Sequence, residues 1–154
     1  MSSRPDRTMA PPGLASSRTL NVPIVLAAIA AVLCLGVAAI HLIDQGGVPG
    51  SKDPGDIGIG YYLLEISAVI VAVLLLAPRT RNSVMVWAVA FLAGLVPIVG
   101  YCLSRGPGLP DYADDRGNWT EPLGLISLVV EAVLMVVSLV GVTRAKAVVA
   151  DSAV

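Results

Sequence analysis

The sequence predicts an all-α integral membrane protein, folded as an antiparallel four-helix bundle with both termini in the cytoplasm. Of its 154 residues, 56% are hydrophobic and 14% are charged, and the mean hydropathy is +0.82, which lies outside the range of soluble domains. Four apolar stretches each approach the ~20 residues that a helix needs to cross a ~30 Å hydrocarbon core. The Lys and Arg residues that flank these stretches gather on one side, which sets the orientation.

The chain divides into two tails and one membrane domain. Residues 1–20 are rich in Arg, Pro and Ser and lack apolar periodicity, so we expect a disordered cytoplasmic tail. Residues 21–143 form the four-helix transmembrane domain, and residues 144–154 form a second cytoplasmic tail, which we expect to be a frayed extension of the fourth helix. The expected helices cover residues 22–43, 59–77, 83–103 and 122–142. The first stretch also has basic residues before it, as a signal peptide would, but it is long for the apolar region of one.

Basic residues predict the orientation in a bacterial inner (plasma) membrane. Seven of them fall before the first helix, between the second and third, or after the fourth: Arg4, Arg7, Arg18, Arg79, Arg81, Arg144 and Lys146. The opposite side holds Lys52, Arg105 and Arg116. The positive-inside rule therefore places both termini in the cytoplasm and the two longer connections outside.

Aromatic residues mark the expected membrane interfaces. Tyr61, Tyr62, Tyr101 and Trp119 fall near the outer ends of their helices, and Trp87 falls near the inner one. Amphipathic rings collect at such interfaces. An alternative is that Tyr61, Tyr62 and Trp119 form a stacking platform for a ligand.

Each expected helix carries a stripe of small or polar residues at its 3.6-residue period. The stripes consist of Ala27, Ala30, Cys34, Ala38 and His41; Tyr61, Glu65, Ala68 and Ala72; Ala90, Ala93, Pro97, Gly100 and Ser104; and Gly124, Ser127, Glu131 and Ser138. Lipid gives helices no hydrophobic reason to associate, so close packing of small residues and interhelical hydrogen bonds must hold them together. We expect these stripes to face the bundle interior.

Glu131 interrupts the fourth apolar stretch near its middle, close to the bilayer midplane. An ionisable group there costs roughly 2.5–3.5 kcal/mol on insertion scales, so it marks a candidate site. The candidate intramembrane polar site consists of His41, Asp44, Glu65, Ser127 and Glu131, with Glu121 above it. Three interpretations remain open: a hydrogen-bonded tie between helices, a proton or ion pathway or small-ligand pocket, and a metal site built from His41, Glu65 and Glu131.

Several classes of function find no support in the sequence. The net charge of −1 offers no basic surface for nucleic acid. Nucleophile-elbow, zinc-protease, P-loop and dinucleotide-binding motifs are absent, so we expect neither an enzyme nor a cofactor. Cys34 and Cys102 lie in different apolar stretches and are expected to pack as small core residues.

Three segments, 38–42, 57–76 and above all 99–133, resemble a family of small four-helix membrane proteins of high-GC actinobacteria, over roughly residues 25–142. The residues within these segments that carry the resemblance are His41, Gly100, Tyr101, Ser104, Arg105, Gly108, Leu109, Pro110, Trp119, Glu121, Pro122 and Glu131. The resemblance implies the fold and the location, and it transfers no catalytic roles. It also directs attention to an outer-loop site that consists of Ser104, Arg105, Trp119 and Glu121.

The sequence therefore predicts a structural or accessory membrane protein, embedded in the lipid bilayer. It would associate with itself or with a membrane-protein partner through its small-residue stripes and outer loops. The alternative is a protein that binds or transports a proton, a metal or a small molecule through the intramembrane His and Glu residues.

Overall fold

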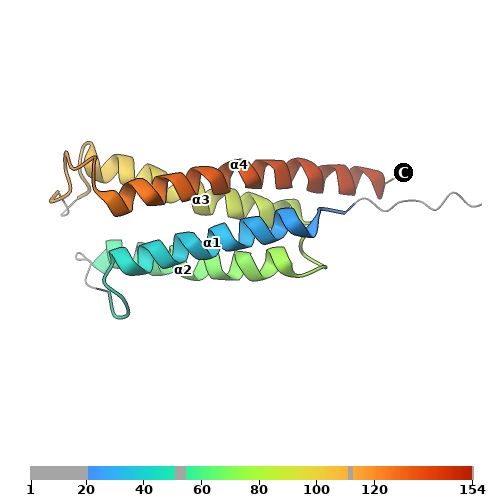
Figure 1. The fold of residues 1–154 in the computed structure, drawn as a ribbon, viewed down its shortest axis with the longest axis horizontal. Coiled ribbons are helices and arrows are strands. Elements are labelled where there is room, and N and C mark those ends of the chain that lie inside the picture. Colours follow the sequence, from blue (N-terminus) through green and yellow to red (C-terminus); the bar gives the residue numbers. More distant parts are fainter. Residues whose placement is uncertain (1–20, 51–54, 111–112, 154) are drawn as a thin grey trace, which may run out of the picture.

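The computed structural model describes residues 21–50, 55–110 and 113–153, and the regular elements in this part of the chain are four α-helices. They are α1 (Ile24–Asp44), α2 (Gly55–Leu76), α3 (Val84–Arg105) and α4 (Pro122–Asp151), drawn in Figure 1. All four are long and apolar enough to cross a membrane. The prediction of an all-α chain with four potential membrane-spanning helices is confirmed.

The helix bounds differ from the expected ones at two places. The second helix begins at Gly55 rather than at residue 59, and the fourth continues to Asp151 rather than ending at residue 142. No Gly or Pro follows Gly141 in α4, and the alanines and lysine of the segment favour a helix. Ala145 is also buried against the other helices. Most of the predicted second tail is therefore helical, whereas the predicted tail at residues 1–20 lies outside the described residues.

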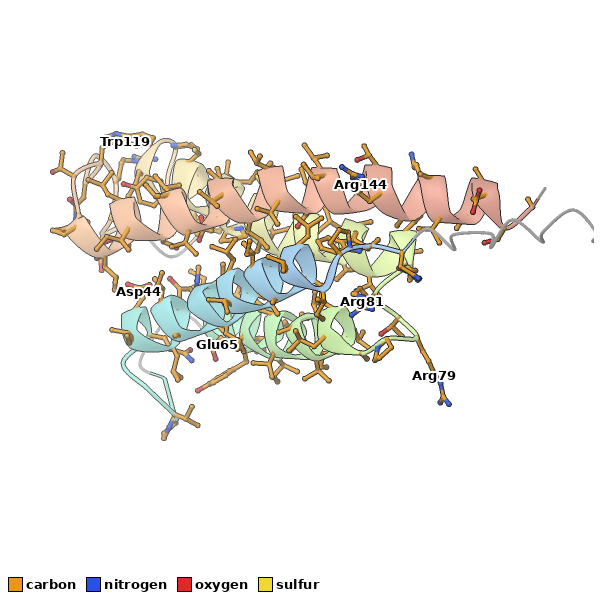
Figure 2. The ribbon with its side chains drawn as sticks, turned by 45° about the vertical axis from the view of Figure 1, so that its right-hand side comes forward. Asp44, Glu65, Arg79, Arg81, Trp119 and Arg144 are labelled. Atoms are coloured by element: carbon orange, nitrogen blue, oxygen red, sulfur yellow. The ribbon has the colours of Figure 1, made fainter. Side chains whose placement is uncertain are left out.

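The four helices lie side by side along one long axis, with the connections at its two ends. Figure 1 shows the α1–α2 and α3–α4 connections at one end, and the α2–α3 turn and the C-terminal end of α4 at the other. Asp44 and Trp119 lie toward the first end, which we name the loop end; Arg79, Arg81 and Arg144 lie toward the second, which we name the arginine end (Figure 2). The closest pairs are α1 with α2 and α3 with α4, whereas α2 and α3 pack least closely of the neighbouring pairs.

The small-residue stripes form the interior, as predicted. Their buried members are Ala27, Ala30, Cys34, Ala38, Glu65, Ala68, Ala72, Ala90, Ala93, Ser104, Ser127, Glu131 and Ser138. Large aliphatic side chains such as Val32, Ile70 and Val129 point outward and are exposed. This inside-out distribution suits a lipid environment, in which van der Waals packing of small residues brings helices together.

Trp87 lies near the arginine end, and its side chain is fully buried among the helices. Its indole Nε1 donates a hydrogen bond of 2.8 Å to the carbonyl of Arg81, and its ring covers Gly141, where any Cβ would collide with it. The missing side chain at Gly141 is what lets the indole fit into the core.

Candidate functional site

A cavity of about 270 Å³ lies between all four helices at the loop end. Its lining combines apolar residues with titratable, hydroxyl-bearing and aromatic groups. The polar members are His41, Asp44, Tyr61, Tyr101, Ser104, Arg105, Asp115, Glu121, Ser127 and Glu131. Ligand sites in proteins typically have this character, with a mostly apolar wall and a few convergent polar groups.

Glu131 forms the deep end of this cavity. Its side chain is 1% exposed, and Ser127, one turn earlier on α4, donates a hydrogen bond to its Oε1. The backbone around it is fixed by α3, because a Cβ at Gly94 would lie 2.6 Å from the Glu131 carbonyl oxygen. The glycine therefore permits the close approach of α3 and α4 that holds this carboxyl group in position.

His41 faces Glu131 across the cavity from α1. Its Nε2 lies 3.8 Å from Glu131 Oε1, and its Nδ1 lies 2.9 Å from the carbonyl oxygen of Val37. A contact with a carbonyl requires the proton on Nδ1, so in the neutral imidazole Nε2 carries the lone pair. An acceptor nitrogen and a carboxyl group thus converge on the same space.

Tyr61 and Asp44 form the side of the cavity toward α1 and α2. The Tyr61 hydroxyl donates a hydrogen bond to Asp44 Oδ2, which joins the first turns of α2 to the last turn of α1. The Tyr61 ring also lies 5.4 Å from the imidazole of His41, in a tilted arrangement. Tyr61 of α2 therefore contacts both His41 and Asp44 of α1, and all three side chains line the cavity.

Arg105 organises the rim of the cavity at the end of α3. Its Nη1 lies 2.6 Å from Asp115 Oδ2 and its Nη2 lies 2.7 Å from Glu121 Oε2. Its Nε donates to the carbonyl of Asn118 at 3.0 Å, and the guanidinium lies 4.9 Å from the centre of the Tyr101 ring. One buried cation thereby fastens the α3–α4 connection over the cavity.

The Tyr101 ring covers the rim of the cavity and lies against Gly124 in the first turn of α4. Its hydroxyl donates to the carbonyl of Trp119 at 2.8 Å, and the two rings meet edge to face with centroids 6.0 Å apart. A Cβ at Gly124 would lie 2.6 Å from Tyr101 Cε2, so the glycine leaves the space that this ring occupies. Trp119 does not line the cavity, and 46% of its surface is exposed.

Glu65 lies apart from the other predicted site residues. It accepts a hydrogen bond of 2.8 Å from Gln45 Nε2 and does not line the cavity (Figure 2 labels it on α2). This pair ties the α1–α2 connection to α2. Glu65 is therefore not beside His41 and Glu131, and nowhere in the described part of the chain do three or more His, Cys, Asp or Glu side chains gather as a metal site would require.

The cavity does not continue to the arginine end. Between Glu131 and that end the buried side chains of the described residues are apolar, including Leu75, Trp87 and Leu134, with the exception of Ser138. Ser138 Oγ has no hydrogen-bond partner among the described residues. The interior of the bundle thus contains polar side chains in its loop-end half, whereas its other half is filled almost entirely by apolar side chains.

The structure thus brings together all but two of the predicted site residues. The residues that meet at the cavity are His41, Asp44, Ser104, Arg105, Glu121, Ser127 and Glu131. Sequence reasoning missed Asp115, Tyr101 and Gln45. The surplus of acidic residues around Arg105 and Arg116 was a usable signal for Asp115, whereas no periodicity marked Gln45.

Comparisons with known protein families, with curated proteins and with solved structures found no match. The resemblance to small membrane proteins of actinobacteria stays a prediction, and the function rests on the geometry of this chain.

Proposed function

We propose that this is an integral membrane protein that binds a small ligand in the cavity at the loop end. The observation that carries the proposal is the convergence of Glu131, His41 and Asp44 on one space between four helices. Intramembrane ionisable groups are costly, and their grouping around an open volume favours a use beyond fastening helices together. No chemical step is needed for this role, in keeping with the expectation that the protein is not an enzyme.

The proposal includes an orientation. Arg79, Arg81 and Arg144 lie toward one end and the cavity lies at the other (Figure 2). The positive-inside rule then supports an antiparallel bundle in the bacterial plasma membrane, with both termini in the cytoplasm and the cavity at the outer face. The ligand would be bound from the outer side.

An accessory role is the other function that the sequence favoured. This role was predicted from the small-residue stripes and the outer loops as surfaces for a partner, and the stripes are largely buried within this chain. The four helices of the chain already use these stripes to pack against one another. A proton or ion path across the membrane has less support, because the buried side chains below Glu131 are largely apolar. Ligand binding at the loop end is therefore the better-supported proposal.

Two buried serines on α4 provide a matched test. Ser127 lines the cavity and donates a hydrogen bond to Glu131, whereas Ser138 is also buried and lies outside the cavity. The protein is extracted from its membrane in mild detergent and its native mass is recorded. We expect a defined mass excess in the wild type and in Ser138→Ala, and at least a tenfold weaker retention in Ser127→Ala. Equal retention in both variants, or a bare chain in the wild type, would refute ligand binding at this site.

A further inference from the structure

A second hollow lies beside the cavity, on the surface between α2 and α3. Its volume is about 350 Å³ and its lining is almost entirely apolar. The lining residues are Gly60, Leu63, Leu64, Ser67, Val89, Leu92, Ala93 and Val96. We name it the α2–α3 groove.

The cavity and the groove share part of their lining. Gly60, Leu64 and Val96 border both. Gly60 is exposed, and a Cβ placed there would meet nothing within 4 Å. The looser packing of α2 on α3 is consistent with this groove. The cavity and the groove are therefore neighbours at the α2–α3 side of the bundle, the face that would contact lipid.

The groove covers much of the depth of one lipid leaflet. Gly60 and Ser67 lie about 8 and 18 Å along α2 from its first residue, at ~1.5 Å per residue. The hydrocarbon part of one leaflet is about 15 Å thick, half of the ~30 Å core. The groove thus follows the path of an acyl chain, while the rim of the cavity at Arg105 and Glu121 lies at the helix ends, nearer the level of a headgroup.

The charge of the cavity selects among headgroups. Among the described residues that line it, four carry carboxyl groups, namely Asp44, Asp115, Glu121 and Glu131, and one carries a guanidinium group, Arg105. Arg105 is already paired with two of these carboxylates, so a ligand phosphate finds little unmatched positive charge. The lining as a whole keeps an excess of carboxyl groups over guanidinium groups, so an ammonium group would meet a net negative charge and the acceptor Nε2 of His41.

We propose that the ligand is a membrane lipid with an ammonium headgroup, which enters laterally between α2 and α3. Its headgroup occupies the cavity and one hydrocarbon chain lies in the α2–α3 groove. This inference rests on the proposed function, since it assigns the chemical class and the entry route of the ligand in the same cavity.

Gly60→Leu tests the route, because Gly60 borders both hollows and a Cβ placed there meets no protein atom within 4 Å. Gly55→Leu is the matched control, since it makes the same change at another open glycine of α2 that lines neither hollow. Delipidated full-length protein is incubated with phosphatidylethanolamine or phosphatidylglycerol of identical chains, and retained lipid is counted by native mass spectrometry. Val96→Trp repeats the test from α3 if Gly60→Leu does not fold.

We expect the wild type and Gly55→Leu to retain phosphatidylethanolamine at least tenfold better than phosphatidylglycerol, and Gly60→Leu to lose this retention. Equal retention of both lipids would overturn the ammonium headgroup, and undiminished retention by Gly60→Leu would overturn the lateral route. Free ethanolamine supplies a further arm. If it binds the wild type and Gly60→Leu alike while the lipid does not, the lipid inference fails and the proposed function stands. If the wild type retains no molecule of any kind, the proposed function itself fails.

Discussion

Replacing Arg105 by Gln should destabilise the loop end of the bundle. The substitution removes ion pairs of 2.6 Å to Asp115 and 2.7 Å to Glu121, the hydrogen bond to the Asn118 carbonyl, and the contact with the Tyr101 ring. The Arg105 side chain is 8% exposed, but the two carboxylates are 24% and 30% exposed, so water screens each pair. We therefore assign about 1 kcal/mol to each ion pair, rather than the larger value of a fully buried pair.

The two remaining contacts of Arg105 add to this loss. The hydrogen bond to the carbonyl contributes about 1 kcal/mol and the cation–π contact about 0.5–1 kcal/mol. The sum is about 3.5–4 kcal/mol, although contacts of one side chain are not strictly additive. The assay is reversible unfolding of the purified protein by SDS in mixed micelles, followed by circular dichroism. We expect the free energy of unfolding of Arg105→Gln to fall by that amount.

Arg116→Gln is the matched control, because Arg116 lies in the same connection and is exposed. Surface substitutions of this kind usually change stability by less than about 0.5 kcal/mol. If Arg105→Gln and Arg116→Gln have the same free energy of unfolding, Arg105 does not fasten the α3–α4 connection and the description of the rim is wrong.

Two further predictions concern packing and orientation. Gly94→Ala should lower the free energy of unfolding by about 1–3 kcal/mol, because the new methyl group would lie 2.6 Å from a carbonyl oxygen of α4. Gly36→Ala meets its nearest atom at 3.5 Å and should be neutral or stabilising; equal losses in the two variants would show that α3 and α4 do not approach as closely as described. In a background without native cysteines, a membrane-impermeant maleimide should label Asp114→Cys in intact cells and Arg79→Cys only after lysis. The reverse pattern would invert the orientation.

The fold could be predicted largely from composition and periodicity, because in lipid every backbone group must be satisfied within a helix and only apolar stretches of sufficient length can cross. The stripes of small residues also identified the interior correctly, down to Ala68 and Ala90. The end of the fourth helix was predicted at residue 142, with only a frayed extension beyond it, because hydropathy marks where the apolar stretch ends. A helix that contains Ala, Lys and Arg can continue past that point, and α4 does so to Asp151.

Part of the site could be predicted from the sequence. Whether a residue could be placed correctly depends on what fixes the position of its side chain. His41, Ser127 and Glu131 lie on the interior faces of their helices, and helical period places them there. Glu65 also lies on an interior face, yet it pairs with Gln45 rather than entering the cavity. That choice depends on the path of the α1–α2 connection, which periodicity does not describe.

The burial of each aromatic side chain could likewise not be predicted from the sequence. Trp87 and Trp119 are both amphipathic aromatic residues of the kind that collect at membrane interfaces. Gly141 makes room for Trp87 in the core, whereas Trp119 remains partly exposed beside Tyr101. Such pairings depend on which helix faces which, and that information appears only when the four helices are packed.

The most direct test of the account compares two buried carboxyl groups by native mass spectrometry. Glu131 lies in the cavity and accepts a hydrogen bond from Ser127, whereas Glu65 lies outside it and accepts one from Gln45. Each is replaced by the isosteric Gln, and the mass of the protein extracted from the membrane is compared with that of the wild type. The account predicts a ligand mass on the wild type and on Glu65→Gln, and its loss from Glu131→Gln. Retention of that mass by Glu131→Gln, or its absence from the wild type, would contradict the assignment of the cavity as a binding site.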